Sequence, residues 1–241
     1  MLNDRRILAV VPARGGSKGV KNKNIHPLLG RPLIAHTAEL IAQLPWVDRA
    51  VVSTDSDLIA TTAEAHGLAA PFRRPESIAG DRIGDWDVLN HALLEMERQD
   101  ACRYDTVLML QPTGPLRRAE HVEACARKQT AEDWDAVWTV TPIDLKYHPL
   151  KQLTLGENGA TALFDLRGRQ IIARQQLTPT YYRNGACYAL SRSCILDQKT
   201  TMGQRWAATV IEEVMVSIDT LEDFALVEQV LRERAAGAGT T

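Results

Sequence analysis

Short apolar runs alternate with segments of helical periodicity over the first 140 residues of the chain. The apolar runs predict buried strands, and Asp105–Pro112 is almost continuously apolar, which is typical of a strand covered on both faces. Between these runs, apolar residues recur every three or four positions and predict helices. The predicted strands are Ile7–Val11, Arg49–Asp55, Asp105–Pro112 and Asp135–Pro142, and the predicted helices are Arg31–Leu44, Ser56–Gly67, Gly84–Arg98 and a segment through Val122 and Cys125.

This alternation indicates a fold class. Strands that alternate with helices favour right-handed βαβ crossovers, which build a mainly parallel sheet. We therefore predict an α/β, Rossmann-like fold. A chain of 241 residues, of which 45% are hydrophobic, suits one domain (residues 1–241) that carries a modest insertion.

The alternation stops after Pro142. From Ile143 to Arg183 the chain mixes proline, glycine, charge and short apolar runs without a helical period. We interpret this stretch, about residues 143–183, as an inserted lobe of hairpins and loops that packs onto a partner subunit. Because the lobe is too irregular to be self-contained, the chain is predicted to form a homodimer.

Regular structure is predicted to return after this stretch. A last helix is expected to start at Thr220, where Asp223 makes a capping-box-like beginning. The preceding apolar segments are Gly185–Ser191, Ala207–Val214 and Met215–Asp219, the last of which we expect to be a strand. The apolar face of the helix is predicted to contain Leu221, Phe224, Val227 and Leu231, and the tail Ala235–Thr241 is expected to fray.

Charge and cysteine content exclude some classes of function. A formal net charge of −2 gives no bulk attraction to nucleic acid or to an anionic membrane, so neither is expected as a partner. The apolar run near the N-terminus is too short for a signal peptide or a membrane span. Reduced thiols in a cytoplasmic protein explain the widely spaced cysteines better than disulfides or a metal site. The cysteines are Cys102, Cys125, Cys187 and Cys194.

The first predicted strand runs into a loop rich in glycine and positive charge, "VVPARGGSKGVKNKN" (Val10–Asn24). A Walker loop would place Gly-Lys-Ser/Thr at its end, and here Lys18 precedes Gly19. A dinucleotide-binding loop would open directly into a helix, whereas Pro27 and Gly30 come first. Neither phosphate-binding motif is therefore present in its usual form.

A long, open loop at the carboxyl end of a strand can instead wrap a triphosphate. Gly15 and Gly16 allow backbone N–H groups to approach phosphate oxygens, and Arg14, Lys18 and Lys23 supply positive charge. A solvated basic loop is the alternative, and composition alone does not separate the two. The glycine spacing and the position after the first strand favour phosphate binding.

The loop also belongs to a longer resemblance. The segment "PARGGSKGVKNKN" is similar to the N-terminal signature of the acylneuraminate cytidylyltransferases, the CMP-sialic acid synthetase family. Further motifs follow in order and cover nearly the whole chain, so that together they are highly specific. They are "VSTD" (Val52–Asp55), "RRPE" (Arg73–Glu76), "LQPTGPLR" (Leu110–Arg117), "HPLK" (His148–Lys151), "RQQL" (Arg174–Leu177), "RNGACY" (Arg183–Tyr188) and "SIDTLEDF" (Ser217–Phe224).

The resemblance implies a fold of the nucleotide-diphospho-sugar transferase type and a reaction. Members of the family join CTP to the anomeric hydroxyl of a nonulosonic acid, with release of pyrophosphate. The matching positions imply that Arg14, Lys23 and Asp219 are catalytic. They imply nucleotide binding by Ala13, Arg14, Gly15, Gly16, Ser17, Lys18, Asn24, Arg74, Asp85 and Gln111, of which Arg74 and Gln111 resemble the residues that read cytidine.

The resemblance further implies sites for the sugar and for a metal. The sugar would be bound by Gln111, Lys151, Arg174, Arg183, Asn184 and Tyr188, with Arg174 reaching into the site of a partner subunit and Lys151 pairing with the sugar carboxylate. Asp219 would bind Mg²⁺, the expected cofactor. From the residues alone, Asp219 could equally stabilise the N-terminus of the last helix.

Two positions depart from the family pattern. Ser217 stands where an Asp-x-Asp motif would have its first aspartate, so one expected metal ligand is missing. Asp85 stands where a small hydroxyl residue is expected, and a carboxylate there would repel a triphosphate unless a cation lies between them. The single Asp219 also resembles the arrangement in CMP-Kdo synthetases.

Two alternatives follow from these departures. One is CMP-Kdo synthesis, although "LQPTGPLR" lacks the acidic residue that Kdo enzymes usually carry in the corresponding motif. The other is a non-catalytic nucleotide-binding protein with a degenerate metal site. The leading prediction is a cytidylyltransferase that acts on a sialic-acid-like nonulosonic acid.

Overall fold

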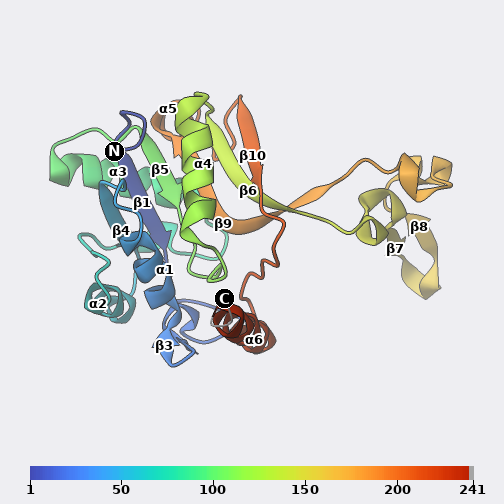
Figure 1. Cartoon of the computed structure of the whole chain (residues 1–241), viewed down its shortest axis with the longest axis horizontal. Coiled ribbons are helices and arrows are strands. Elements are labelled where there is room, and N and C mark those ends of the chain that lie inside the picture. Colours follow the sequence, from blue (N-terminus) through green and yellow to red (C-terminus); the bar gives the residue numbers. More distant parts are fainter. Residues whose placement is uncertain (239–241) are drawn as a thin grey trace.

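A six-stranded sheet forms the centre of the protein in a computed structural model that describes residues 1–238 (Figure 1). The strand order is β10-β6-β9-β5-β1-β4, and β9 is antiparallel to both of its neighbours whereas the other pairs are parallel. The prediction of a mainly parallel α/β sheet is therefore confirmed. The strands of this sheet are β1 (Ile7–Pro12), β4 (Arg49–Ser53), β5 (Thr106–Met109), β6 (Ala136–Pro142), β9 (Tyr181–Ser191) and β10 (Trp206–Val210).

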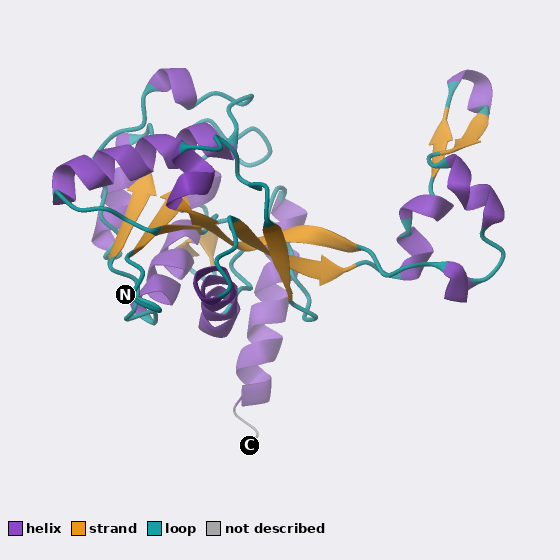
Figure 2. Cartoon of the chain, turned by 90° about the horizontal axis from the view of Figure 1, so that it is seen from above, coloured by secondary structure: helices purple, strands orange, loops and turns teal. Residues whose placement is uncertain are grey.

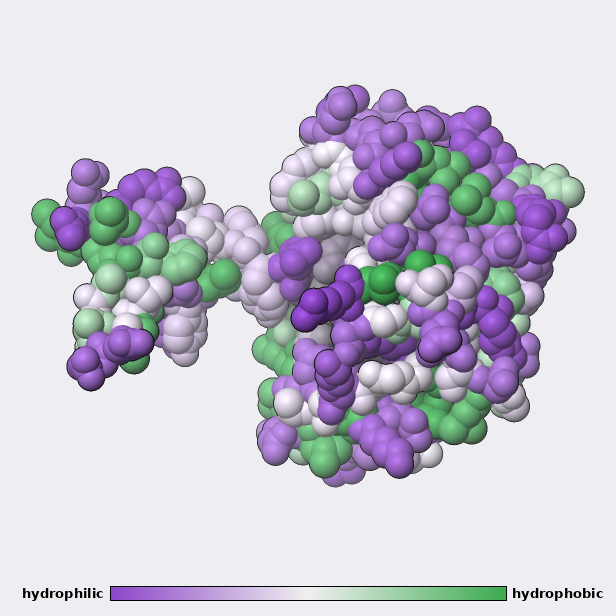
Figure 3. Space-filling view, turned by 180° about the vertical axis from the view of Figure 1, so that it is seen from behind, coloured by the Kyte–Doolittle hydropathy of each residue, from purple (hydrophilic) through white to green (hydrophobic). Residues whose placement is uncertain are grey.

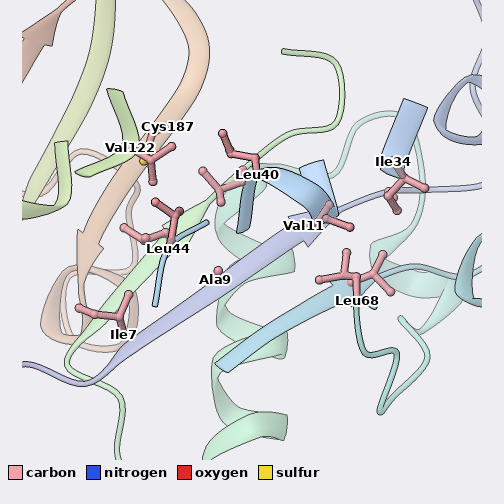
Figure 4. Packing of buried hydrophobic residues seen from close by; sticks show 14 of the residues in the cluster. Ile7, Ala9, Val11, Ile34, Leu40, Leu44, Leu68, Val122 and Cys187 are labelled. Carbon is pink, nitrogen blue, oxygen red and sulfur yellow. The ribbon is translucent and has the colours of Figure 1, made fainter. Parts of the chain in front are cut away.

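Helices cover both faces of the sheet (Figure 2). Alternate residues of β1 point to opposite faces: Ile7, Ala9 and Val11 join one core, and Leu8 and Val10 join the other. The first core packs against α1, α2 and α4 (Figure 4), and the second packs against α3 and α5. These helices are α1 (Leu33–Ala42), α2 (Asp57–Ala65), α3 (Asp85–Asp100), α4 (Ala119–Ala131) and α5 (Arg192–Leu196).

The first helix begins two residues later than predicted. Pro27–Leu28 (β2) and Arg31–Pro32 (β3) pair as a small antiparallel hairpin, so helix α1 starts at Leu33. The turn of the hairpin places Gly30 in the left-handed region, with φ of 78°. A short 3₁₀ helix, η1 (Lys23–Ile25), precedes the hairpin, and another, η2 (Glu76–Ile78), follows strand β4 and helix α2.

The predicted insertion projects from the body on two strands (Figures 1 and 2). Strands β6 and β9 carry it, with Pro142 opposite Tyr181, so Tyr181–Arg183 belongs to β9 rather than to the lobe as predicted. The lobe contains one hairpin, β7–β8, and five 3₁₀ helices. Its elements are η3 (Leu145–Tyr147), η4 (Pro149–Lys151), β7 (Leu153–Leu155), η5 (Glu157–Gly159), β8 (Thr161–Leu163), η6 (Leu166–Gln170) and η7 (Arg174–Gln176).

The C-terminal part differs from the prediction in two respects. Met215–Asp219 forms no strand: the chain is irregular after Val210, and Ile218 N–H donates to the Thr113 carbonyl at 2.9 Å. The last helix, α6 (Leu221–Ala238), starts as predicted, but Leu221 is 58% exposed and lies outside its buried face. Phe224 and Val227 are buried against a third core, and Leu231 packs at its margin. Of the tail predicted to fray, 235–238 continue the helix and 239–241 lie outside the described residues.

Two further features bear on the predicted class of protein. All four cysteines are free, and Cys125, Cys187 and Cys194 are buried. Within residues 1–238, helices long and apolar enough to cross a bilayer are absent.

Candidate active site

A cavity of about 450 Å³ opens beyond the carboxyl ends of β1 and β5. This is the edge at which parallel α/β sheets bind ligands. Nine of the residues predicted to act in catalysis or to bind nucleotide or metal line it: Arg14, Ser17, Lys18, Lys23, Asn24, Arg74, Asp85, Gln111 and Asp219. The rest of the lining consists of Pro12, Gly19, Gly80, Asp81, Ile83, Val88, Pro112 and Thr113.

The glycine loop packs directly against the segment that carries Asp219. A Cβ atom on Gly19 would lie 2.3 Å from the Asp219 carbonyl oxygen, so only glycine fits at this position. A Cβ atom on Gly16, in contrast, would meet nothing within 4 Å, so this side of the loop is open. The close contact at Gly19 brings Lys23 beside Asp219: Lys23 Nζ donates to Asp219 Oδ1 and to the Ile218 carbonyl, each at 2.8 Å.

The side chain of Asp219 is free of any role in helix capping. Asp223 caps the helix instead: its Oδ2 accepts from the N–H groups of Asp219 and Thr220, each at 2.8 Å, and its own N–H donates to Thr220 Oγ1 at 3.2 Å. This arrangement is the predicted capping box. These hydrogen bonds lower the pKa of Asp223 and hold the backbone of Asp219 in place. The Asp219 side chain remains 75% exposed and faces the cavity.

Two cations of the loop are paired with a carboxylate that the sequence did not single out. Arg14 and Lys18 both form ion pairs with Asp81, which lies between η2 and α3. The hydrogen bonds from Lys18 and Arg14 lower the pKa of Asp81. Asp81 stands near glycines in an irregular stretch, and no local pattern there indicates a functional acid.

The loop backbone is less available than predicted. The Gly15 N–H donates to Asp55 Oδ1 at 2.9 Å, so this group is occupied by the acid that follows β4. Ala13 is buried and donates its N–H to the Ser53 carbonyl. Asn24 Nδ2 donates to the Arg14 carbonyl at 3.0 Å and so fixes the start of the loop.

Arg74 forms a rigid wall of the cavity. Its Nε donates to Ser53 Oγ at 3.1 Å, its Nη2 donates to the Ser53 carbonyl, and the residue is buried. Burial is the main cause that lowers the pKa of Arg74 to about 10, with Asp55 acting in the opposite direction. The guanidinium stays protonated at neutral pH and cannot easily change position.

The backbone of Gln111 is held in place by a buried arginine, Arg117. Arg117 donates to the Gln111 carbonyl, to Ala186 O at 2.9 Å and to Thr37 Oγ1 at 2.8 Å. Burial lowers the pKa of Arg117 to about 10. Two backbone carbonyls and one side-chain hydroxyl therefore meet at this one side chain, and the motif that contains Arg117 does not by itself indicate this role.

Asp85 begins helix α3 and faces the cavity. The residue as a whole is exposed to solvent. Its carboxyl group, however, is partly enclosed by the cavity walls, and this desolvation raises the pKa of Asp85. Arg183 and Arg74 act in the opposite direction on that pKa. Positive charge therefore stands next to Asp85, which offsets the repulsion expected between this acid and a triphosphate.

The residues predicted to bind sugar are not all brought together. Arg183 is exposed and lies 5.2 Å from the centre of the Trp138 ring, against which Tyr188 also packs. The Asn184 side chain is buried and bonds to Thr139 and Thr141, so it supports the sheet rather than facing the cavity. Strand β9 carries Arg183, Asn184 and Tyr188, and none of the three lines the cavity.

Lys151 and Arg174 lie in η4 and η7 of the lobe that projects from the body (Figure 1). Sequence order gives no information about this separation, because "HPLK" and "RQQL" follow the other motifs without interruption in the resemblance. Neither side chain lines the cavity of its own chain.

The donors present restrict how a metal can bind. Among residues 1–238 there is no group of three or more His, Cys, Asp or Glu side chains that could hold an ion. Asp219 is a single exposed carboxylate with one oxygen bonded to Lys23. Such a site fits Mg²⁺ that arrives with a nucleotide, because Mg²⁺ commonly takes one or two carboxylates together with phosphate oxygens and water.

Comparison with known proteins finds similarity over almost the whole chain. The family model described as Cytidylyltransferase matches residues 8–239. The CMP-N,N'-diacetyllegionaminic acid synthase of Legionella pneumophila is 32% identical over 94% of this chain and 96% of its own length. An N-acylneuraminate cytidylyltransferase of Escherichia coli is 31% identical over 92% of this chain, which spans about half (51%) of that longer protein.

The fold also has a solved counterpart. The structure of a CMP:2-keto-3-deoxy-manno-octonic acid synthetase complexed with CTP superposes with a TM-score of 0.73 and covers 95% of this chain and 99% of its own. The two sequences are 17% identical, so the likeness concerns the fold alone.

Proposed function

The chain belongs to the cytidylyltransferase family, and we propose that it transfers the cytidylyl group of CTP to the anomeric hydroxyl of a nonulosonic acid. The observation that carries this proposal is the cavity at the carboxyl edge of the sheet. Three cations of one glycine loop line this cavity, and the loop is open at Gly16. These cations are Arg14, Lys18 and Lys23. Relatives that make CMP-legionaminic and CMP-sialic acids support the substrate class.

In the proposed reaction, the anomeric hydroxyl gives its proton to solvent water, and its oxygen attacks the α-phosphorus of CTP. The bond between the α-phosphorus and the bridging oxygen breaks, and pyrophosphate leaves with the bonding electrons. Negative charge grows on the departing group, so Arg14 and Lys23 would stabilise the transition state more than the bound substrate. Arg74 and Gln111 would hold the nucleoside, because both residues line the same cavity and both are held in place. The Arg74 side chain donates to Ser53 Oγ, and the Gln111 carbonyl accepts from Arg117.

Magnesium is proposed as the cofactor, held by Asp219 and the triphosphate. When bound there, the ion would neutralise phosphate charge and favour departure of pyrophosphate. Lys23 contacts the same carboxylate and would keep it oriented toward the phosphates. The missing carboxylate at Ser217 would be replaced by water or a phosphate oxygen.

The reaction is tested by measuring pyrophosphate release from CTP and Mg²⁺ with a panel of acceptors. The panel contains N-acetylneuraminic, N,N'-diacetyllegionaminic and pseudaminic acids and Kdo. We expect turnover with at least one of the first three acids and at most weak turnover with Kdo. Turnover with Kdo alone would contradict the proposal, and no turnover with any acceptor would favour a non-catalytic nucleotide-binding protein.

A homodimer is proposed from the projecting lobe. Hydrophobic side chains gather on its surface (Figure 3): Leu155, Phe164 and Ile172 are 78%, 64% and 93% exposed. Exposed apolar groups of this kind are typical of a protein interface. If a second copy covered these groups, Lys151 and Arg174 of one copy would lie at the cavity of the other. There the two cations would bind the carboxylate of the sugar. A cytoplasmic location stays a prediction.

Mixing two inactive variants tests this arrangement. Lys23→Ala removes a residue of the cavity, and Arg174→Ala removes a residue of the lobe. If each lobe serves the partner's site, random exchange of subunits should restore about a quarter of wild-type activity, since half of the dimers then hold one complete site. Light scattering should give twice the chain mass of 26.7 kDa.

Two results would contradict the dimer proposal. One is a monomer with full activity. The other is failure of the mixture to regain activity although subunit exchange is demonstrated with differently tagged chains, because Arg174 would then act within its own chain or not at all.

A further inference from the structure

The phosphate-binding cations are already bound to an anion of the protein itself. Asp81 Oδ1 accepts from Arg14 Nη1, and Asp81 Oδ2 pairs with Lys18 Nζ. Each carboxylate oxygen therefore contacts a different cation. Two non-bridging oxygens of a phosphate would make the same kind of contact, so Asp81 and a triphosphate cannot fully use these cations at the same time.

Within residues 1–238, the stretch that carries Asp81 is held by few other polar contacts. Its backbone hydrogen bonds are local, from Ala79 N–H to the Glu76 carbonyl at 3.0 Å and from Ile83 N–H to the Gly80 carbonyl at 3.3 Å. The Asp81 side chain is 37% exposed and lies at the cavity wall, so it can leave the cations without unfolding any buried structure.

We propose that Asp81 competes with the nucleoside triphosphate for Arg14 and Lys18. It occupies Arg14 and Lys18 in the free protein, is displaced when the triphosphate binds, and returns to the cations when pyrophosphate leaves. This inference rests on the proposed function of the cavity. It implies that Asp81 weakens the binding of both CTP and pyrophosphate and so limits inhibition by the product.

The test compares Asp81→Asn with wild type by calorimetry at a fixed, low ionic strength and without sugar. The probes are CTP, inorganic pyrophosphate and cytidine. Asp81→Asn should bind CTP and pyrophosphate on the order of 3- to 10-fold more tightly, because two partly exposed ion pairs no longer compete. Cytidine, which has no phosphate, should bind equally to both proteins, and pyrophosphate should inhibit the variant at correspondingly lower concentrations.

Glu76→Gln is the matched control. Glu76 is an exposed acid of the same segment that does not line the cavity, so its removal tests the effect of one negative charge nearby. It should leave all three affinities unchanged. Should Asp81→Asn prove unstable by thermal melting, Asp81→Ser provides the same test, since serine also lacks the charge.

A crystal structure of the wild-type protein with pyrophosphate separates displacement from simple repulsion. We expect phosphate oxygens on Arg14 and Lys18 and no contact from Asp81. Equal or weaker binding by Asp81→Asn, or an Asp81 that stays on both cations in the complex, would overturn the inference. If CTP fails to bind any of these proteins, the proposed function fails, and the inference is then judged on pyrophosphate alone.

Discussion

Lys23→Ala is expected to lower kcat by roughly 10²- to 10³-fold, the loss typical when one preorganised donor is removed from a developing negative charge. Lys23 Nζ lies in the cavity and contacts Asp219, and the residue belongs to none of the three hydrophobic cores. Its loss should therefore change the melting temperature by at most a few degrees. Steady-state kinetics with CTP and thermal unfolding measured on the same preparation check both parts.

Lys21→Ala is the control for this experiment. Lys21 is an exposed lysine of the same loop and does not line the cavity, so its replacement removes equal charge without touching the site. It should keep kcat close to the wild-type value. A Lys23→Ala protein that melts much lower yet turns over normally would show that the contact with Asp219 is structural.

Asp219→Asn is expected to reduce turnover by roughly 10²-fold or more, because bound metal commonly supplies several kcal/mol of transition-state stabilisation. The half-saturating Mg²⁺ concentration should rise at the same time. The substitution keeps the size of the side chain and leaves the Asp223 capping interactions intact, since these use the backbone of Asp219. Folding should therefore be preserved.

A second measurement separates metal binding from the orientation of Lys23. Electron paramagnetic resonance of Mn²⁺ with a non-reactive CTP analogue reports the ion directly, and we expect Asp219→Asn to weaken ternary binding. Glu222→Gln, which changes an exposed acid of the first helical turn, is the control and should bind as wild type does. Unchanged Mn²⁺ binding with low activity would mean that Asp219 acts only through Lys23.

Much of the fold follows from periodicity. Strands β1, β4, β5 and β6 and helices α2 and α3 form close to the predicted positions, since a buried strand or an amphipathic helix is encoded by residues next to one another. The errors lie where local pattern is weak. Met215–Asp219 is apolar enough for a strand, but it finds no partner strand and packs as an irregular segment against core residues.

Only part of the candidate site can be predicted from the sequence. Glycines and cations in one loop point to phosphate without any structure, and Thr220 with Asp223 identifies the start of a helix. The partner of the Gly15 N–H could not be predicted, because the acid that accepts its hydrogen bond, Asp55, follows a different strand. Asp81 was missed altogether, since an acid in an irregular stretch has no periodic signal.

The amino-acid sequence alone determined the alternation of strands and helices, the cationic loop after the first strand and the cap of the last helix, because each depends on residues a few positions apart. Only the tertiary structure decided that Lys23 meets Asp219, 196 residues away, that Asp81 occupies Arg14 and Lys18, and that the lobe stands clear of the cavity. Such contacts depend on how loops without periodicity fold back onto a finished sheet, and close approaches such as that at Gly19 exist only once the whole chain has packed.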